Sequence, residues 1–155
     1  MAGLAGEGSL YDAMNAMAVI FADQTGESNL TVNTLFSGSR SDPFTRGSIQ
    51  NISEDNFTPA NLIGGFLNGI AQELYNLYLP LGKRDNANLK RLIGGGNGVR
   101  KNGPLRRILA EKFQVPLEVP LYHEEAAYGA ALFALTCTGY FKNVFQAQRL
   151  VRYME

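Results

Sequence analysis

The sequence predicts an α/β domain, and three observations lead to that prediction. Segments of alternating apolar and polar residues, such as 30–36 and 116–121, are interspersed with segments of helical periodicity. Three consecutive glycines at 94–96 lie between a short strand and a capped helix, a connection typical of α/β sheets. Apolar residues make up 45% of the 155 residues, which is enough for one buried core. We therefore expect short strands with packed helices in a single domain.

The first elements follow from local signals. Residues 1–8 are rich in glycine and alanine and are expected to form a flexible lead-in. Ser9 fits the N-cap of a helix that runs to about residue 22. Its apolar face would carry Leu10, Met14, Met17 and Phe21. The pattern then predicts a strand at 30–36, an irregular loop at 37–46 and a short strand at 47–52.

The strongest helix signal begins at Thr58, a suitable N-cap, with Pro59 in the first helical position. Pro80 and Gly82 are expected to end this helix near residue 79. Each buried apolar side chain contributes about 1.5–3 kcal/mol to stability, so this helix is predicted to be central to the core. The apolar stripe consists of Leu62, Phe66, Ile70, Leu74 and Leu77, flanked by Ile63 and Leu67.

The second half repeats the alternation of strand and helix. A strand at 89–93 leads into the glycines, and Asn102 caps a helix at about 103–114. After the strand at 116–121, Glu124 begins a helix of unusually small residues, and 141–154 is predicted to form a further amphipathic helix. Cys137 is expected to be a small buried apolar side chain.

The overall charge argues against two classes of partner. Lys plus Arg and Asp plus Glu both number 14, so the chain has no concentrated positive charge with which to attract nucleic acid or an anionic membrane. No apolar run approaches the roughly 20 residues that span a bilayer. The first eight residues lack the features of a signal peptide, so a cytoplasmic location is expected. One cysteine excludes an intramolecular disulfide.

The glycines at 94–96 allow a ligand to approach the backbone closely, and the helix that follows offers free N–H groups and a partial positive charge. No Gly-Lys-Ser/Thr motif is present, so this is not a P-loop. A dinucleotide fingerprint would require glycine in place of Val99 or Lys101. On these residues alone, an ordinary tight connection and a ligand site both remain open.

Residues 92–133 resemble the adenosine-binding segment of the FGGY carbohydrate kinases. The strand end, the glycines, Asn102, the helix after it, the strand at 116–119 and the Glu-Ala-Ala-Tyr-Gly-Ala-Ala run at 125–131 follow the family's order and spacing. The resemblance implies a ribonuclease-H-like fold, shared with actin and Hsp70, and ATP with Mg²⁺ as cofactors. It also implies that the small-residue helix packs behind the glycine loop. The implied nucleotide-binding residues are Gly94, Gly95, Gly96 and Asn102.

A second segment, 47–68, is similar to the C-terminal signature of the same family. Asn51, Gly65 and Asn68 depart from its usual residues. The preceding Phe-x-Gly-x-Arg-x-Asp-Pro pattern at 36–43, and the longer spacing from Gly96 to Asn102, resemble the sedoheptulokinases most. The resemblance therefore favours a ketose such as sedoheptulose as the substrate, and it extends over about residues 30–138.

Several parts that the family uses for catalysis are not found in this sequence. The resemblance implies an N-terminal lobe with a phosphate hairpin, sugar-binding side chains and an aspartate base in a Gly-Asp motif. Residues 9–155 are therefore expected to be a partial C-terminal ATP-binding lobe. This lobe would supply the adenosine pocket, leave Mg²⁺ mainly to the missing lobe, and be inactive alone.

The remaining polar residues receive less specific expectations. Among the carboxylates, Asp42 is expected to cap its loop and Glu73 to lie on the polar face of a helix, while His123 is expected to be a cap or surface residue. The basic pairs 100–101 and 106–107 fit phosphate contacts or a solvated helix face equally well.

Two alternative functions remain open. One is a non-catalytic sensor or interaction module of the same superfamily. The other is a Rossmann-type oxidoreductase domain with Glu118 as the ribose-binding acid, although the glycine spacing argues against it. If the chain is a truncated domain, its sheet would expose an edge and an apolar face, so a homodimer is expected.

Overall fold

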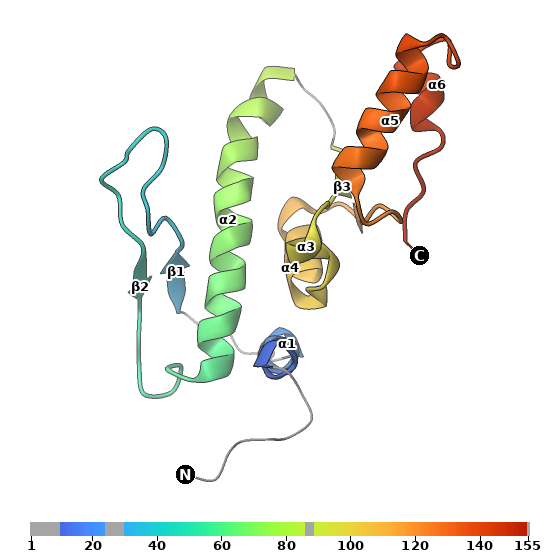
Figure 1. Ribbon diagram of the computed structural model, residues 1–155. Helices are drawn as coiled ribbons and strands as arrows, with labels where there is room; N and C mark the ends of the chain where they lie inside the picture. Colours follow the sequence, from blue (N-terminus) through green and yellow to red (C-terminus); the bar gives the residue numbers. More distant parts are fainter. Residues whose placement is uncertain (1–9, 24–29, 86–88, 155) are drawn as a thin grey trace.

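The computed structural model describes residues 10–23, 30–85 and 89–154 (Figure 1). The expected lead-in at 1–8 and the Ser9 cap lie outside the described residues. Helices and short strands are mixed along the chain, as predicted for the α/β class. The elements are α1 (Leu10–Asp23), β1 (Thr31–Asn33), β2 (Ser48–Gln50), α2 (Pro59–Asp85), β3 (Leu92–Ile93), α3 (Asn97–Arg100), α4 (Gly103–Phe113), β4 (Leu117–Glu118), α5 (Glu125–Cys137) and α6 (Val144–Gln148).

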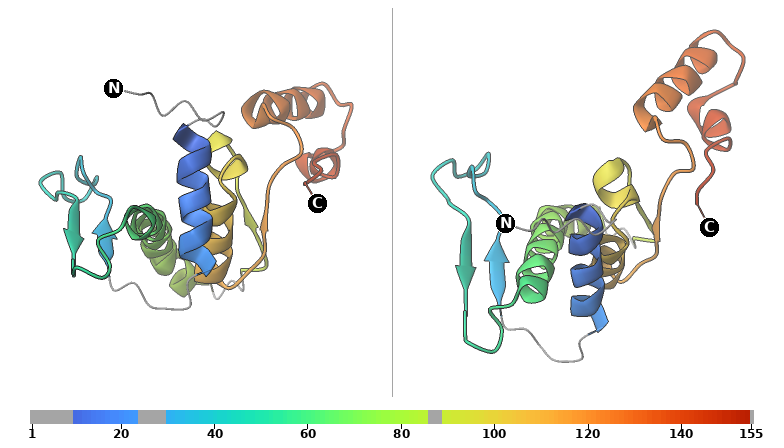
Figure 2. Two further views of the ribbon diagram at one scale, coloured as in Figure 1. Left: turned by 90° about the horizontal axis from the view of Figure 1, so that it is seen from below. Right: turned by 60° about the horizontal axis from the view of Figure 1, so that its bottom comes forward.

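The described strands form two separate sheets of two strands each. Strands β1 and β2 are antiparallel, with Val32 opposite Ile49, whereas β3 and β4 are parallel, with Leu92 opposite Leu117. The two sheets lie on opposite sides of α2, which is visible in both Figure 1 and Figure 2. Each strand is shorter than the sequence predicted.

The core lies where α1 and α4 pack against one face of α2. Its buried residues are Ala18 of α1, Leu67 and Ala71 of α2, and Leu105, Ile108 and Leu109 of α4. Tyr75 of α2 meets Phe113 of α4 edge to face, with ring centroids 5.2 Å apart, a favourable aromatic geometry. This face joins the N-terminal helix to the helix that follows the glycines.

Glycines on α2 allow other elements to come close. A Cβ on Gly64 would overlap the ring of Phe21 from α1. On the β1 side, a Cβ on Gly69 would lie 2.5 Å from the carbonyl oxygen of Val32. These glycines therefore allow α1 and β1 to approach the backbone of α2 closely.

The prediction that the large apolar stripe of α2 forms the core is wrong for its C-terminal part. Ile70 is 37% exposed, Leu74 45%, Leu77 66% and the further residue Leu81 60%. These four residues, called here the α2 stripe, lie between the face that packs on β1 and the face that packs on α1 and α4. Among the described residues no element covers the stripe, whereas Leu67 is 7% exposed and Ala71 is fully buried.

Other boundaries also differ from prediction. Pro80 does not end α2, which continues to Asp85. A proline inside a helix removes one backbone N–H, and here its ring lies on the exposed side. The helix expected at 141–154 is reduced to Val144–Gln148, because the chain beyond it extends to pair with residues 119–121. In that pairing Leu121 N donates to Arg152 O at 2.8 Å and Met154 N to Val119 O at 2.8 Å.

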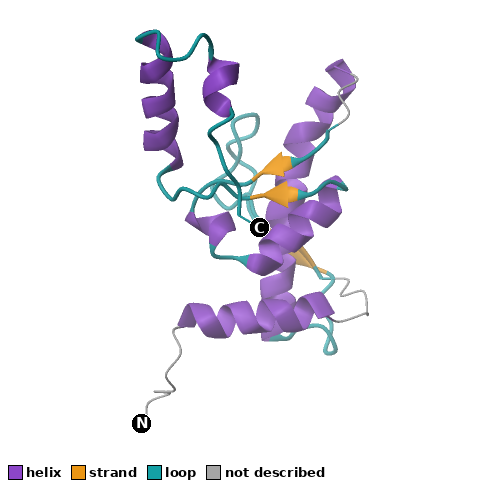
Figure 3. Cartoon of the chain, turned by 90° about the vertical axis from the view of Figure 1, so that its right-hand side faces the viewer, coloured by secondary structure: helices purple, strands orange, loops and turns teal. Residues whose placement is uncertain are grey.

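Helices α5 and α6 pack against each other and stand apart from the other helices (Figure 3). The small residues of α5 are consequently exposed, and a Cβ on Gly129 would meet no atom within 4 Å. The expectation that these residues pack behind the glycine loop is therefore wrong. The same exposure makes Cys137 a surface thiol rather than a buried one.

Candidate functional site

The glycine loop begins where β3 ends, and its first glycine has a packing reason. Gly94 N donates to the carbonyl oxygen of Glu118 at 2.9 Å, which extends the pairing of β3 with β4. A Cβ at Gly94 would lie 2.6 Å from Cγ1 of Val99 and 3.1 Å from Cδ2 of Leu117. Glycine is thus needed at this position for contacts within the chain.

The next glycines are not explained by packing. Gly96 has φ +83°, a conformation that favours glycine, but a Cβ there would meet no atom within 4 Å. Gly95 has ordinary φ, and the nearest atom to its Cβ would be Cδ of Glu125 at 3.8 Å. Gly98 likewise faces open space. Bare backbone at 95, 96 and 98 is therefore accessible to a ligand.

Asn102 is the N-cap of α4, as predicted. Its Oδ1 accepts a hydrogen bond from Leu105 N at 2.9 Å, and Pro104 occupies the first turn. The Nδ2 group of Asn102 has no hydrogen-bond partner among the described residues. The side chain therefore fixes the helix start with its oxygen and keeps a donor available.

Two hollows of the described chain have volumes of about 420 Å³ and about 730 Å³, and the larger of these two adjoins Asn102. Its lining comes from α1 and from the segment after the glycines: Tyr11, Asp12, Asn15, Asn97, Gly98, Lys101 and Asn102. A neighbouring hollow of about 280 Å³ shares Tyr11, Asn15 and Asn102. Of the predicted site residues, Asn102 lines both hollows, whereas Gly94, Gly95 and Gly96 line neither.

Sequence reasoning missed the contribution of α1. Tyr11 and Asn15 are one helical turn apart, so they share a face, and this face lies beside the turn α3. Their spacing was a usable signal. Nothing in the sequence, however, indicated that a helix nearly ninety residues earlier would lie beside Asn102.

Arg100 ends α3 and is 8% exposed. Its Nη2 lies 2.8 Å from Pro120 O, 2.8 Å from Tyr122 O and 2.8 Å from Oε1 of Glu125. Arg100 was expected either to contact phosphate or to lie on a solvated helix face. Neither expectation is correct, because the side chain is buried and its guanidinium donates to acceptors within the protein.

The other basic residues differ from Arg100. Arg106 donates to the carbonyl oxygen of Arg100 at 2.6 Å, so it also supports the turn. Arg107 pairs with Glu111 at 2.9 Å on an exposed helix face, which matches the solvated expectation. Lys101 is exposed and lines the larger cavity.

Glu125 links the glycine loop to the start of α5. Its Oε1 accepts from Gly96 N at 3.2 Å as well as from Arg100. The Arg100 hydrogen bond, followed by those from the amides of Glu125 and Gly96, holds the pKa of this carboxyl below its ordinary value of 4.5. The carboxylate is therefore the form that the loop binds.

The loop at 37–46 is braced by its own residues, as predicted for Asp42. Oδ1 of Asp42 accepts from Phe44 N at 3.0 Å and from Thr45 N at 3.2 Å, and Oδ2 accepts from the Thr45 hydroxyl. The Thr45 hydroxyl and the Phe44 amide hold the pKa of Asp42 below its ordinary value of 3.8. Arg46 donates to Pro43 O at 2.8 Å.

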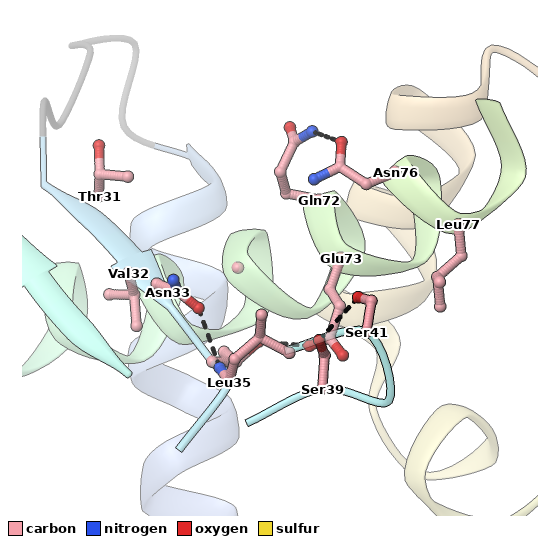
Figure 4. Close-up of a pocket in the computed structure, with 12 residues that line it drawn as sticks. Thr31, Val32, Asn33, Leu35, Ser39, Ser41, Gln72, Glu73, Asn76 and Leu77 are labelled. Atoms are coloured by element: carbon pink, nitrogen blue, oxygen red, sulfur yellow. Dashed lines mark hydrogen bonds between the residues drawn. The ribbon is translucent and has the colours of Figure 1, made fainter. Parts of the chain in front are cut away.

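The cavity of about 420 Å³ lies on the other side of α2, between that helix and β1 (Figure 4). Glu73 reaches from α2 toward Ser39 and Ser41 of the loop, and its Oε2 accepts from the Thr34 hydroxyl at 2.8 Å. Glu73 is half-buried, so the expectation of a plain polar helix face was incomplete. Its role is to bind β1 to α2.

The structure also bears on residues that could have belonged to a metal site, an acid–base site or a Rossmann-type site. Within the described part of the chain, no three His, Cys, Asp or Glu side chains lie close enough together to hold a metal ion. His123 is exposed before α5, as expected of a surface residue. Glu118, the ribose-binding acid of the Rossmann alternative, pairs with Arg91 at 2.7 Å.

No helix of residues 10–23, 30–85 and 89–154 is long and apolar enough to cross a bilayer.

Comparison with known proteins identifies the class of protein that this fold and loop define. Residues 5–137 match the model of the FGGY family of carbohydrate kinases, C-terminal domain. The sedoheptulokinase of Homo sapiens is 26% identical over 129 residues, which are 83% of this chain and 26% of that protein. The chain therefore belongs to the FGGY family of carbohydrate kinases.

Solved structures agree on the fold. Xylulose kinase from Rhodospirillum rubrum superposes with a TM-score of 0.79 at 24% identity, over 98% of this chain and 30% of that one. Glycerol kinase from Plasmodium falciparum, solved with ADP, gives 0.71 at 21% identity, over 91% and 29%. The fold is thus that of sugar kinases of the actin and Hsp70 type. The chain spans between a quarter and a third of the length of these relatives.

Proposed function

We propose that this chain is the nucleotide-binding part of an ATP-dependent carbohydrate kinase, and that it supplies the pocket for adenosine. The observation that carries the proposal is the bare backbone at Gly95, Gly96 and Gly98, which contacts within the chain do not explain. It lies next to Asn102 and the cavity of about 730 Å³, a volume within the usual range of small-molecule sites.

The chemistry of the lining fits a nucleoside. The exposed ring of Tyr11 offers a flat surface for a purine, and the Nδ2 group of Asn102 offers a donor to a ring nitrogen or ribose oxygen. Lys101 at the rim offers a positive charge to a phosphate. Family membership supports the same ligand, as does the glycerol kinase relative whose structure was solved with ADP.

Phosphoryl transfer would require parts outside this chain. Transfer depends on positioning and on charge stabilisation by groups around the phosphates, including Mg²⁺. We infer that a missing N-terminal lobe supplies the sugar site, the base and most Mg²⁺ contacts, so that residues 9–155 are inactive alone. The exposed α2 stripe, flanked by two separate two-stranded sheets, supports the inference that further polypeptide packs here.

The acceptor would be a sugar hydroxyl, and a ketose such as sedoheptulose is the favoured substrate. The human relative and the spacing between Gly96 and Asn102 support this choice. A kinase assay of the longest natural protein that contains this chain, against a panel of ketoses, tests it. Transfer to sedoheptulose no faster than to the other sugars would contradict the choice.

Nucleotide binding can be tested on the chain itself by isothermal titration with adenosine and ADP. Gly95→Val should weaken binding strongly, because its side chain would occupy the ligand's approach while fitting the chain's own contacts. Asn102→Asp keeps the capping oxygen and loses the Nδ2 donor, so it should weaken binding with little loss of stability.

Matched controls separate binding from folding. Asn143 caps α6 through the same kind of bond, to Gln146 N at 3.0 Å, far from the cavity. Asn143→Asp and Gly129→Val should leave affinity unchanged. Equal binding by the wild type, Gly95→Val and Asn102→Asp would remove the loop from the proposal.

A non-catalytic module is the alternative, and the structure gives a packing reason for one of the departures that motivated it and a backbone reason for another. A Cβ at Gly65 would lie 2.6 Å from Cδ2 of Leu30. Asn51 has φ +60°, a conformation that asparagine tolerates better than most residues. These residues therefore serve the local fold, and they do not favour the module over the kinase.

A further inference from the structure

We propose that Arg100 and Glu125 are positioning residues that hold the glycine loop in the form that receives the nucleotide. We call this ion pair the loop latch. The proposal rests on the proposed function, because it names the residues that prepare the same site. Neither residue lines the larger cavity, so both would act through the backbone of the loop.

Arg100 is anchored more firmly than a surface arginine. Its Nη2 is within 2.8 Å of two carbonyl oxygens and of Glu125, so two N–H groups serve three acceptors. Its Nη1 lies 3.5 Å from Sδ of Met154, and Arg106 binds its carbonyl oxygen. Because these acceptors belong to the segment at 120–125 and to the C-terminal segment that pairs with residues 119–121, Arg100 fixes α3 to both.

Glu125 connects the anchored Arg100 to the glycine loop. One oxygen, Oε1, receives both the guanidinium at 2.8 Å and Gly96 N at 3.2 Å. The pair is partly shielded, with the side chain of Arg100 6% exposed and that of Glu125 28% exposed. A charge-assisted bond to a backbone N–H is stronger than a neutral one, so the amide of Gly96 has a defined direction.

The direction of one amide determines that of the carbonyl before it. No cis peptide bond occurs in the described chain, and in a trans peptide the N–H and C=O groups point in opposite directions. When Gly96 N–H points to Glu125, the carbonyl of Gly95 must point away from it. The latch thus presents an acceptor at Gly95, on the bare part of the loop, to a donor of the nucleoside.

A latch is needed because the loop is intrinsically free. Glycine loses more backbone entropy on ordering than any other residue, and four of the five residues from 94 to 98 are glycine. Without the latch the ligand would have to order them, which reduces affinity. The turn α3 accounts for the longer spacing between Gly96 and Asn102. Its last residue is Arg100, which restrains the loop.

The test compares Glu125→Ala and Glu125→Gln with Glu111→Ala in the complete 155-residue chain. Glu111→Ala is the matched control, because it breaks an exposed pair with Arg107 on α4. Adenosine affinity is measured by isothermal titration, and amide exchange at Gly96 by NMR. Losing the latch bond should weaken adenosine binding about tenfold in Glu125→Ala and accelerate Gly96 exchange by a similar factor. Glu125→Gln retains a neutral acceptor and should fall between.

The outcomes distinguish the latch from the proposed function. If the wild type binds adenosine and folded Glu125→Ala binds it equally well, the positioning proposal is wrong. If the wild type itself does not bind, the proposed function fails, while faster exchange at Gly96 would still establish the latch as a structural device. A variant that loses stability but keeps its affinity would assign Glu125 to folding alone, as would failure of Glu125→Gln to recover any affinity over Glu125→Ala.

Discussion

Two glycine-containing loops of the described chain, at 37–46 and at 94–98, are held in different ways. In the loop at 37–46, the partners of Asp42 and Arg46 lie within three residues of them. In the loop at 94–98, the partner of the Gly96 amide is Glu125, 29 residues away, and that carboxylate is fixed by Arg100. One loop forms its own shape, whereas the other takes its shape from the domain.

A third region, on α2, is largely exposed among the described residues. The α2 stripe consists of large apolar side chains that are 37–66% exposed. Local, distant and absent partners imply different responses to mutation. A self-braced loop should tolerate loss of one contact, a loop held from a distance should not, and the uncovered stripe should respond in association rather than in stability.

The largest effect is expected at Arg100. Arg100→Met keeps much of the side-chain volume but leaves two carbonyl oxygens and Glu125 without their donor. We expect the free energy of unfolding to fall by about 2–4 kcal/mol, since three partly buried acceptors lose their charged donor. Arg46→Met, in the self-braced loop, should cost less than about 0.5 kcal/mol because Arg46 is exposed. Urea unfolding of both variants measures the difference, and equal losses would contradict the comparison.

Two glycines with similar φ angles provide a finer test. Gly38 has φ +80° and Gly96 has φ +83°, but a Cβ at Gly38 would lie 2.5 Å from Pro43 O, whereas one at Gly96 would meet nothing. Gly38→Ala should therefore cost about 2–3 kcal/mol and Gly96→Ala about 1 kcal/mol, the strain of φ alone. Thermal unfolding measures both. A larger loss at Gly96 would mean that the loop is more constrained than its open surroundings indicate.

Acid should weaken both loops. Folded Asp42 and Glu125 have pKa values below their ordinary values of 3.8 and 4.5, so each contributes stability above its ordinary pKa and loses it as pH falls through the lowered one. Asp42→Asn and Glu125→Gln should each make stability depend less steeply on pH in this acid range. Urea midpoints measured as the pH is lowered below the ordinary values test this. An unchanged slope in Glu125→Gln would mean that its carboxylate is not held by the latch.

The same distinction explains what the sequence could predict. Caps such as Asn102 and Asp42 act over a few residues, and both were predicted correctly. Arg100 looked like any exposed basic residue, because its acceptors are 20 or more positions away. Periodicity identified the apolar residues of α2 but not which element covers them. The presence and the start of the helix were therefore predicted correctly, while its end and the burial of Ile70, Leu74 and Leu77 were not.

The smallest effect on stability is expected in the α2 stripe. Leu77→Glu replaces a side chain that is 66% exposed, so the free energy of unfolding should change by no more than about 0.5 kcal/mol. If the stripe lacks its natural cover, two copies of the chain can bury it against each other, and a charge there would oppose this association. Sedimentation at increasing concentration should show dimers of the wild type and a shift to monomers in Leu77→Glu. Glu111→Ala, which changes an exposed side chain on α4, serves as the control. A wild type that stays monomeric at high concentration would mean that the exposed stripe does not drive dimerisation. Only the separation of the two sheets would then support the inference that further polypeptide packs on α2.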